Sequence, residues 1–258
     1  MLLAIDIGNT DTVIGLFEKN VLHKVGRFAS DQSQARILMD NSLAGMLSGL
    51  HLKRESIRGC AVSSVVPKLT STFLAWSGDS LGIAPLVISA NLPLGIRFHY
   101  DDPSTLGADR ICNIIAAFGK FGGPAIVVDF GTATTYSVIG ETGDFLGGVI
   151  APGVKTAAAG LFRTTAQLPE VELKFPSSVL GTNTNANIQS GILYAGVDAA
   201  EGMIRRLKSS VGESATVIAT GGLSELIASK IPAINRIEKN LVLEGIAMIY
   251  DRCNRLTL

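Results

Sequence analysis

The feature that most constrains this sequence is a repeated motif in which an apolar stretch ends in Asp, one spacer residue and Gly. The first copy begins at Asp6 and reads Asp-Ile-Gly-Asn-Thr, and the second begins at Asp129 and reads Asp-Phe-Gly-Thr. The apolar, β-branched segments that flank the copies are Leu2–Ile5, Thr12–Leu16, Ala125–Val128 and Thr134–Ile139. Two strands joined by a short turn with glycine form a β-hairpin. The sequence therefore predicts two similar hairpins, each of which opens one half of the chain.

The residue types at these two turns indicate phosphate binding. Glycine has no Cβ, so backbone N–H groups at such a turn can approach phosphate oxygens closely. The hydroxyl groups of Thr10, Thr132 and Thr134 add further donors. The carboxylates of Asp6 and Asp129 repel phosphate, and they make chemical sense if a cation lies between. Two ordinary hairpins are the alternative, because Asp and Gly are common turn residues, but the duplication favours a nucleotide clamp.

Length and composition favour two lobes of similar size. The chain exceeds the length of about 100–200 residues that is usual for one domain. Its 258 residues are 47% hydrophobic, which is enough for a core in each lobe. The helix-breaking segment Gly119–Pro124 offers a boundary, so we expect an N-terminal lobe of residues 1–118 and a C-terminal lobe of residues 119–258.

Strand and helix patterns alternate along the chain, which is typical of α/β architecture. Strands are expected at Leu2–Asp6, Thr12–Phe17, Val21–Phe28, Gly59–Ser64, Pro85–Ile88 and Thr216–Thr220. Helices are expected at about Ala35–Leu50, Pro67–Leu81, Ser104–Phe118, Ala186–Leu207 and Leu241–Cys253.

Charge and cysteine content argue against several classes of function. Charged residues make up 17% of the chain and the formal net charge is zero, which gives no electrostatic basis for binding nucleic acid or a membrane surface. The low charge is instead compatible with self-association. Cys60, Cys112 and Cys253 are odd in number and far apart, unlike a zinc site or a disulfide framework. With no export signal and no apolar run of about 18 residues, we expect a protein of the reducing cytoplasm.

A third informative segment, Gly107-Ala108-Asp109-Arg110, falls in the first turns of the helix expected from Ser104. Asp109 and Arg110 are expected on the polar side of that helix, opposite its isoleucines. The carboxylate can accept a proton from a substrate hydroxyl, and the guanidinium can bind an anionic substrate or the transferred phosphate. The alternative is an exposed helix start at which the helix dipole favours Asp.

Three further segments are candidates for ligand contacts. Phe98-His99-Tyr100 is able to form the wall of a pocket. Gly181-Thr182-Asn183-Thr184 can bind a polar substrate at a helix N-terminus or cap the helix, and the two roles are compatible. Thr220-Gly221-Gly222 at a strand end permits close backbone approach to a flat ligand such as adenine, although a plain turn is the usual meaning of Gly-Gly after a strand.

In combination, these motifs resemble those of the type III pantothenate kinases. The matching segments are Asp6-Ile-Gly-Asn-Thr, Gly107-Ala-Asp-Arg, Asp129-Phe-Gly-Thr-Ala-Thr-Thr, Gly147-Gly-Val-Ile-Ala-Pro-Gly and Ala219-Thr-Gly-Gly, in order over nearly the whole chain. The resemblance implies an α/β, two-lobed ribonuclease H-like fold of the actin, sugar kinase and heat-shock chaperone superfamily. It also implies a homodimer that transfers the γ-phosphoryl group of ATP to pantothenate, the first step of coenzyme A synthesis.

The resemblance further implies roles for individual residues, carried over by position. Asp109 would be the catalytic base, and the substrate contacts would be Tyr100, Gly107, Ala108, Asp109, Arg110 and Thr184. The ATP contacts would be Asp6, Ile7, Gly8, Asn9, Thr10, Asp11, Thr12, Val13 and Thr132. Mg²⁺ would accompany the nucleotide, with Asp6 orienting its hydration shell. Asp129 would be a ligand of a monovalent activator, potassium or ammonium.

Two parts of the chain depart from the family pattern. Asp11 stands where the family often has Asn, which adds negative charge beside the first loop, and residues 30–41 are less typical than the rest. Two alternatives stay open: a sugar kinase of the same superfamily, and a non-catalytic, nucleotide-binding transcriptional accessory protein. The presence of Asp6, Asp109 and Asp129 favours a pantothenate kinase over the accessory protein.

Overall fold

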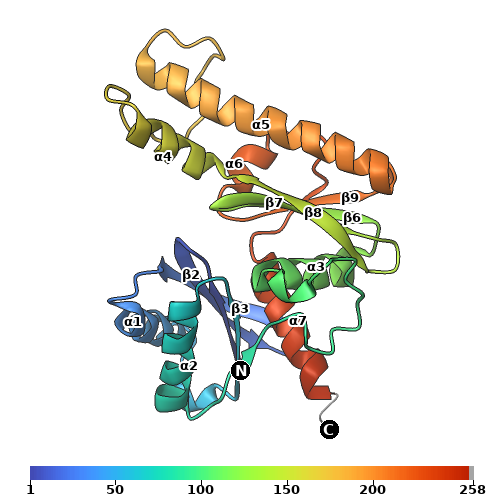
Figure 1. Ribbon diagram of the computed structural model, residues 1–258. Helices are drawn as coiled ribbons and strands as arrows, with labels where there is room; N and C mark the ends of the chain where they lie inside the picture. The colour runs from blue at the N-terminus through green and yellow to red at the C-terminus, as the bar shows by residue number, and fades with distance from the viewer. Residues whose placement is uncertain (256–258) are drawn as a thin grey trace. The chain divides into compact units, whose positions relative to one another are not determined.

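The computed structural model describes residues 1–255, which form two compact units (Figure 1). The first unit contains Met1–Ile96, Asp101–Gly119 and the helix that starts at Leu241, and the second contains Arg97–Tyr100 and Lys120–Asn240. The main difference from the expected lobes of residues 1–118 and 119–258 is the C-terminal helix. This helix belongs with the first unit because it packs on the first sheet. In the part of the chain that the structure describes, no helix combines the length and apolarity needed to cross a membrane.

The first unit is built on a five-stranded sheet with the order β3-β2-β1-β4-β5. Its strands are β1 (Leu2–Ile7), β2 (Asp11–Glu18), β3 (Val21–Ala29), β4 (Gly59–Ser64) and β5 (Leu86–Val87). β1 pairs antiparallel with β2 across the predicted hairpin and parallel with β4 on its other side. A strand in the centre of a sheet that is covered on both faces is apolar throughout, which explains the continuous apolar run before Asp6.

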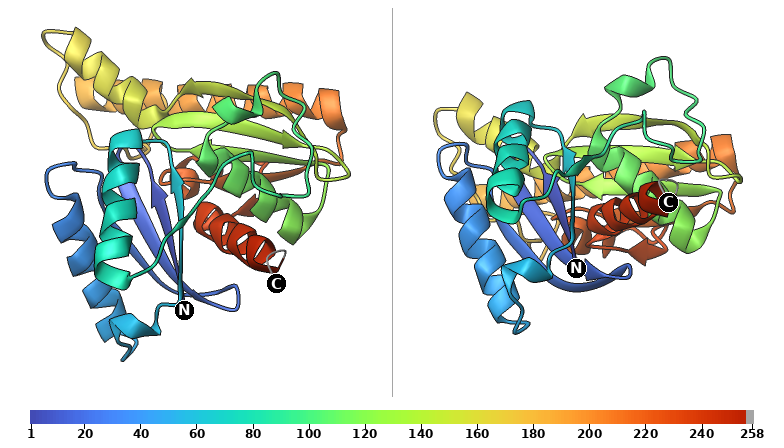
Figure 2. Two further views of the ribbon diagram at one scale, coloured as in Figure 1. Left: turned by 60° about the horizontal axis from the view of Figure 1, so that its bottom comes forward. Right: turned by 90° about the horizontal axis from the view of Figure 1, so that it is seen from below.

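Helices cover both faces of this sheet. α1 (Ala35–Ser48) and α2 (Pro67–Leu81) form a core with Leu3, Ile5 and Ile7 on one face. α7 (Leu241–Arg255) packs on the other side, against β1, β2 and β4, as Figure 2 shows. α3 (Ala108–Phe121) lies so close to α7 that Gly245 touches the backbone of Cys112. Because side chains alternate along a strand, Asp6 points to the face of the sheet opposite the α1 and α2 core.

The second unit repeats the same sheet plan. Its strands lie in the order β10-β9-β6-β7-β8, with β6, β7 and β8 in the places that β1, β2 and β3 hold in the first sheet. The bounds are β6 (Ala125–Phe130), β7 (Ala133–Ile139), β8 (Phe145–Pro152), β9 (Thr216–Thr220) and β10 (Arg236–Ile237). β6 pairs antiparallel with β7 and parallel with β9. Both predicted hairpins are confirmed, and the duplication extends to the whole sheet.

Helices α4 (Val154–Thr164), α5 (Thr184–Val211) and α6 (Ser224–Ala228) pack in the second unit (Figure 1). They form a core with Ile126, Val128 and Phe130 of β6. Asp129 alternates with these apolar residues and therefore lies on the other face of β6. The chain also contains two short 3-10 helices, η1 (Arg54–Ser56) and η2 (Pro103–Thr105).

Four elements of the second unit are absent from the sequence-based prediction: β8, α4, α6 and β10. Gly147 and Gly148 interrupt the apolar pattern of β8. α4 buries a single residue, Val154, so no row of core residues marks it. α6 has five residues and β10 has two, so neither is long enough to show a periodicity.

Candidate active site

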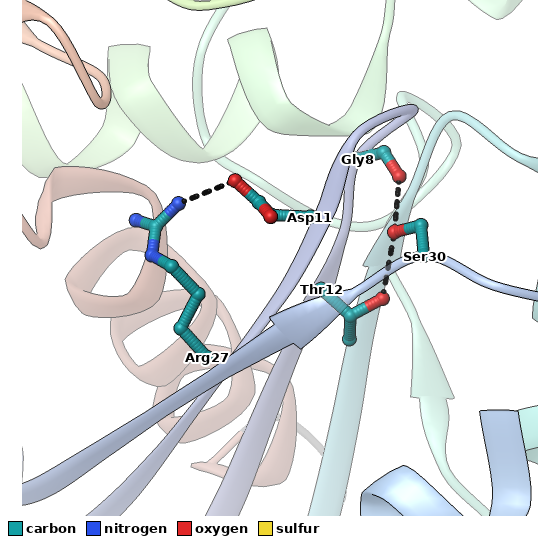
Figure 3. A network of polar contacts seen from close by, with 5 residues as sticks. All are labelled: Gly8, Asp11, Thr12, Arg27 and Ser30. Carbon is teal, nitrogen blue, oxygen red and sulfur yellow. Dashed lines mark hydrogen bonds and ion pairs between the residues drawn. The ribbon is translucent and has the colours of Figure 1, made fainter. Parts of the chain in front are cut away.

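The first hairpin loop, Gly8–Thr10, is held by the residue that follows β3. The N–H of Ser30 donates to Thr10 O at 2.9 Å. The Ser30 hydroxyl donates to Gly8 O at 2.7 Å, as Figure 3 shows. The hydroxyl of Thr12, whose side chain has no exposed surface, lies 3.0 Å from Ser30 Oγ. Across the turn, the N–H of Gly8 donates to Asp11 O at 3.0 Å. The expected ATP loop is therefore held in one conformation by hydrogen bonds within the first unit.

Asp11, the departure from the family pattern, is paired with a cation. Arg27 on β3 places Nη1 3.1 Å from Asp11 Oδ2 (Figure 3). The strand register sets Arg27 opposite Val13, so Arg27 and Asp11 are diagonal neighbours, which long side chains can bridge. The negative charge that Asp11 adds beside the loop is thus balanced from the neighbouring strand.

Asp6 is held by a residue that the sequence analysis did not single out. The parallel pairing of β1 with β4 places Ser63 beside Asp6, and Ser63 Oγ donates to Asp6 Oδ1 at 2.9 Å. Ser63 has no exposed surface, so this hydrogen bond is formed inside the unit. A serine near the end of an apolar strand carries no local signal for this role, because only the strand pairing brings it to Asp6.

Gly107–Arg110 lies at the start of α3, as predicted, but the helix begins later than expected. Asp102 caps a separate turn, η2, by accepting the N–H of Ser104 at 3.0 Å, and α3 begins at Ala108. The predicted helix start at Ser104 is therefore wrong. The competing signal is Asp102, a capping residue that starts its own turn of 3-10 helix.

The prediction that Arg110 lies on a polar, exposed side of the helix is also wrong, because only 6% of this residue is exposed. Every residue of α3 from Ala108 to Ala117 except Asp109 is buried. Apolar periodicity identifies one buried face of a helix but does not reveal what covers the others. A buried guanidinium requires polar or charged groups around it, so Arg110 is an interior residue and not a surface residue.

Asp109 lies beside Arg110 in a largely buried position. Its Oδ1 accepts the N–H of Arg110 at 2.7 Å, and a Cβ at Gly107 would overlap that same oxygen. Burial raises the pKa of Asp109 above its usual value, against the opposing effects of the Arg110 N–H and the Arg110 charge. A carboxylate with a raised pKa is a stronger proton acceptor, which is the property that a general base requires.

Cys112, which lies one helical turn beyond Asp109, is influenced by both Asp109 and Asp6. This thiol is fully buried, and burial raises its pKa well above the ordinary value. The carboxylates of Asp6 and Asp109 raise it further, while a hydrogen bond with Ser63 opposes them. The expected ATP residue Asp6 and the expected base Asp109 therefore both lie close enough to one buried thiol to act on it. We call these residues the Asp6–Asp109 cluster: Asp6, Ser63, Asp109 and Cys112. The sequence analysis missed Cys112 because it considered only paired cysteines.

The turn of the second hairpin is held by the start of α4. The carbonyl oxygen of Thr132 accepts the N–H of Gly153 at 3.2 Å and the hydroxyl of Thr156 at 2.6 Å. Gly153 approaches so closely that a Cβ there would overlap the carbonyl groups of Gly131 and Thr132. This packing therefore requires glycine at position 153, which is the last residue of the motif that begins at Gly147.

Asp129 lies near the end of β6, in register with Thr220 of β9. Gly221 follows with a φ of 91°, a left-handed conformation that favours glycine. A Cβ at Gly221 would overlap Asp129 Oδ1 and the backbone of Phe130, whereas the Cβ position of Gly222 is open. The sequence predicted a close backbone approach to a flat ligand at Gly221-Gly222. In the structure, the close approach at Gly221 is to Asp129.

The expected substrate residues are divided between the units. Gly107–Arg110 belong to the first unit, whereas Tyr100 and Thr184 belong to the second. Tyr100 packs its ring on Phe145 at the start of β8, with the ring centroids 5.7 Å apart, and 39% of its surface is exposed. Tyr100 is thus packed on one aromatic neighbour and partly exposed to solvent.

Thr184 is the exposed first residue of α5. Asn183 caps the helix, because its side chain accepts the N–H of Ala186 at 3.0 Å. The capping role predicted for this segment is confirmed.

In the Phe98-His99-Tyr100 segment, His99 Nε2 lies 3.6 Å from Asp144 Oδ2. Both side chains are partly exposed, so this pair is a surface contact.

Each hairpin carries one carboxylate near the end of its first strand, Asp6 in β1 and Asp129 in β6. Among residues 1–255, no three His, Cys, Asp or Glu side chains are grouped closely enough to hold a metal ion. A single carboxylate, such as Asp6 or Asp129, fits a cation that takes its remaining ligands from phosphate oxygens and water.

The strand order shared by the two sheets, with an Asp-x-Gly hairpin in each, defines a class of protein: those with the two-lobed ribonuclease H-like fold of actin, sugar kinases and heat-shock chaperones. Solved structures agree. A candidate Baf-family transcriptional activator from Campylobacter jejuni is 19% identical with a TM-score of 0.57, and the match covers 99% of this chain and 100% of that one. A candidate N-acetylglucosamine kinase from Porphyromonas gingivalis is 12% identical with a TM-score of 0.54, over 98% and 100% of the two chains. Likeness at these identities shows the fold alone.

Sequence comparison then identifies the family. The model of the type III pantothenate kinase family matches residues 2–206. The type III pantothenate kinase of Roseiflexus castenholzii is 43% identical over 255 residues, which cover 97% of this chain and 98% of the relative. The chain therefore belongs to the type III pantothenate kinases, and the resemblance predicted from its motifs is confirmed.

Proposed function

We propose that this chain transfers the γ-phosphoryl group of ATP to the primary hydroxyl group of pantothenate, which forms 4'-phosphopantothenate at the start of coenzyme A synthesis. Membership of the type III pantothenate kinases supports this activity. The observation that supports it most directly is the Asp6–Asp109 cluster, because a largely buried carboxylate on α3 and the carboxylate of the first hairpin both act on the buried Cys112 thiol.

In the first unit, Asp109 acts as the catalytic base. As the pantothenate hydroxyl oxygen bonds to the γ-phosphorus, the bond from that phosphorus to the bridging oxygen breaks, and Asp109 takes the hydroxyl proton. Arg110 supplies positive charge to the carboxylate of pantothenate or to the transferred group, and Gly107 and Ala108 line this position. The hairpin from Asp6 to Val13 binds the ATP phosphates.

In the second unit, Thr132 contacts ATP, and Tyr100 and Thr184 contact pantothenate. Asp129 is a ligand of a monovalent cation, potassium or ammonium. Its support is the residue types of the second hairpin turn, in which one carboxylate is followed by glycine and threonines, because carbonyl and hydroxyl oxygens suit a large, weakly hydrated ion. Mg²⁺ bound with ATP would neutralise phosphate charge, and Asp6 would hold it through its water ligands.

The proposed assembly is a homodimer in the cytoplasm. On α5 the small residues Gly191, Ala195 and Ala199 are exposed, and no atom lies within 4 Å of a Cβ built at Gly191 or Gly202. Such a surface allows two helices to approach closely across a two-fold axis. Light scattering at micromolar concentration tests the dimer, and a monomeric mass would contradict it.

The proposed location in the cytoplasm is supported by the cysteines. The thiols of Cys60, Cys112 and Cys253 are free, which fits a reducing compartment.

A coupled ADP-release assay with Mg²⁺ and potassium tests the activity, with pantothenate compared with a panel of sugars. We expect ADP release with pantothenate alone, and 4'-phosphopantothenate as the product by mass spectrometry. Release of ADP with a sugar and not with pantothenate would favour the sugar kinase. ATP binding with no ADP release from any acceptor would favour the accessory protein.

A further inference from the structure

We propose that Ser30 is a positioning residue that orients a phosphate-binding amide of the first hairpin loop. This inference rests on the proposed contact between the loop and ATP, and it adds a residue outside the loop and outside the family motifs. Ser30 follows β3 and begins the segment 30–41 that is less typical of the family. Three hydrogen bonds connect it to the loop and to β2. Figure 3 shows the two that its hydroxyl forms, with Gly8 and Thr12.

The directions of the side-chain hydrogen bonds follow from the single hydrogen of a serine hydroxyl. Ser30 Oγ donates that hydrogen to Gly8 O at 2.7 Å. In its 3.0 Å contact with Thr12, Ser30 Oγ must therefore accept, and the Thr12 hydroxyl must donate. The chain of hydrogen bonds runs from Thr12 through Ser30 to Gly8. Since the Thr12 side chain has no exposed surface, its hydroxyl supports the loop and does not donate to a phosphate.

The hydrogen bond to Gly8 O also sets the direction of the next amide. In a trans peptide the C=O of one residue and the N–H of the next point in opposite directions. Because Gly8 O points at Ser30, the N–H of Asn9 points away from Ser30 and β3. Asn9 is exposed, so this N–H is directed to where an anion can reach it.

Ser30 anchors the other end of the loop as well, because its N–H donates to Thr10 O at 2.9 Å. The residues on either side of Asn9 are therefore both tied to Ser30. A donor whose direction is fixed before the anion arrives binds it without the cost of ordering the loop. Loss of the Ser30 hydroxyl frees the Gly8 peptide to rotate, and ATP must then order it on binding.

The test compares Ser30→Ala with Ser30→Thr and with the control Ser33→Ala. Ser33 is an exposed serine three residues away whose hydroxyl donates to Asp31 Oδ1 at 2.7 Å. For Ser30→Ala we expect the KM for ATP to rise about fivefold to tenfold, the loss of one hydrogen bond, with the KM for pantothenate unchanged. Ser30→Thr keeps the hydroxyl and should retain most of the ATP affinity, and Ser33→Ala should match the wild type.

Hydrogen exchange of the loop amides, with and without ATP, separates this inference from the proposed function. ATP should protect the Asn9 amide in the wild type and protect it less in Ser30→Ala. Protection in both proteins, with an unchanged KM for ATP, overturns the role of Ser30 and leaves the loop as the ATP site. Absence of protection in the wild type overturns the loop contact and this inference with it.

A second variant covers the case in which Ser30→Ala does not fold. Thr12→Val keeps the volume of the buried side chain and removes the donor to Ser30 Oγ, so the Ser30 hydroxyl keeps only one of its two hydrogen bonds. The KM for ATP should again rise severalfold in a protein that still unfolds cooperatively. A wild-type KM in this variant overturns the proposed chain of hydrogen bonds.

Discussion

Arg27 and Asp11 form an ion pair between β3 and β2, with 3.1 Å from Arg27 Nη1 to Asp11 Oδ2. Asp11 adjoins the loop that we assign to ATP, and an unbalanced carboxylate there would repel the phosphates. Arg27 lies three residues before Ser30, so one end of β3 supplies both the hydrogen bonds that shape the loop and the charge that balances it.

Arg27→Gln should weaken ATP binding by leaving the charge of Asp11 unbalanced. The pair is partly exposed, so the KM for ATP should rise by about twofold to fivefold, and the effect should shrink at high salt. The double variant Asp11→Asn/Arg27→Gln should restore the wild-type KM. Arg36→Gln, which breaks the exposed Arg36–Asp79 pair between α1 and α2, is the control. An equal rise of the KM for ATP in this control would show that the effect arises from the overall charge of the protein.

Asp109→Asn should abolish most turnover while ATP still binds, because only the proton acceptor changes. Loss of a general base typically reduces the rate by about 10²–10⁴-fold. In the wild type, kcat/KM should fall as the pH drops through the pKa of Asp109, which burial raises above the ordinary value. Steady-state kinetics against pH and a binding measurement with ATP check both parts. Turnover near that of the wild type in the variant would place the base elsewhere.

The same burial should make Asp109 a destabilising residue at neutral pH. Because its pKa is higher in the folded state than in the unfolded state, the folded state binds the proton more tightly. Stability is therefore lost as the pH rises from the unfolded to the folded pKa, and the loss is complete above both. Asp109→Asn should unfold at an equal or higher temperature than the wild type at neutral pH, with a smaller advantage in acid. Thermal unfolding at both pH values measures this, and a lower melting temperature at neutral pH would contradict it.

Ser63→Ala should reduce turnover because Asp6 loses the donor that orients its carboxylate. A hydrogen bond to a charged group typically contributes about 1.5–3 kcal/mol, so we expect kcat to fall by at least about tenfold. Ser77→Ala is the matched control: Ser77 is also fully buried in the first unit, but its hydroxyl donates to Ile83 O at 2.8 Å. The control should lose stability and keep its kcat. Equal losses of kcat in the two variants would make Ser63 a structural residue only.

Asp129→Ala should make the enzyme slow and insensitive to monovalent cations. The carboxylate needs a compensating charge to stay ionised beside ATP phosphates, and potassium or ammonium would supply it. Desalted wild-type enzyme should be active in potassium or ammonium and inactive in sodium. Asp198→Ala, which removes an exposed carboxylate from α5 of the same unit, is the control and should keep the potassium response. Full activity of the wild type in sodium alone would assign Asp129 to Mg²⁺ or to the shape of the second hairpin.

Short-range sequence signals account for most of the elements and for the family. β4 at Gly59–Ser64, α2 at Pro67–Leu81 and β9 at Thr216–Thr220 have the predicted bounds, because apolar runs, a helix-starting proline and glycine stops act between neighbouring residues. The two hairpins follow from the same kind of signal. The ordered motifs also identify the type III pantothenate kinases, as the family model confirms.

Contacts between distant segments account for the rest. Ser63 reaches Asp6 across 57 positions of sequence only because β4 pairs with β1 in one register, and α7 joins the first unit only by packing on its sheet. Arg110 is buried and the pKa of Asp109 is raised because α3 is enclosed on nearly all sides. Local sequence specifies which residues a segment offers, but desolvation depends on everything packed around a group, and that is a property of the folded chain alone.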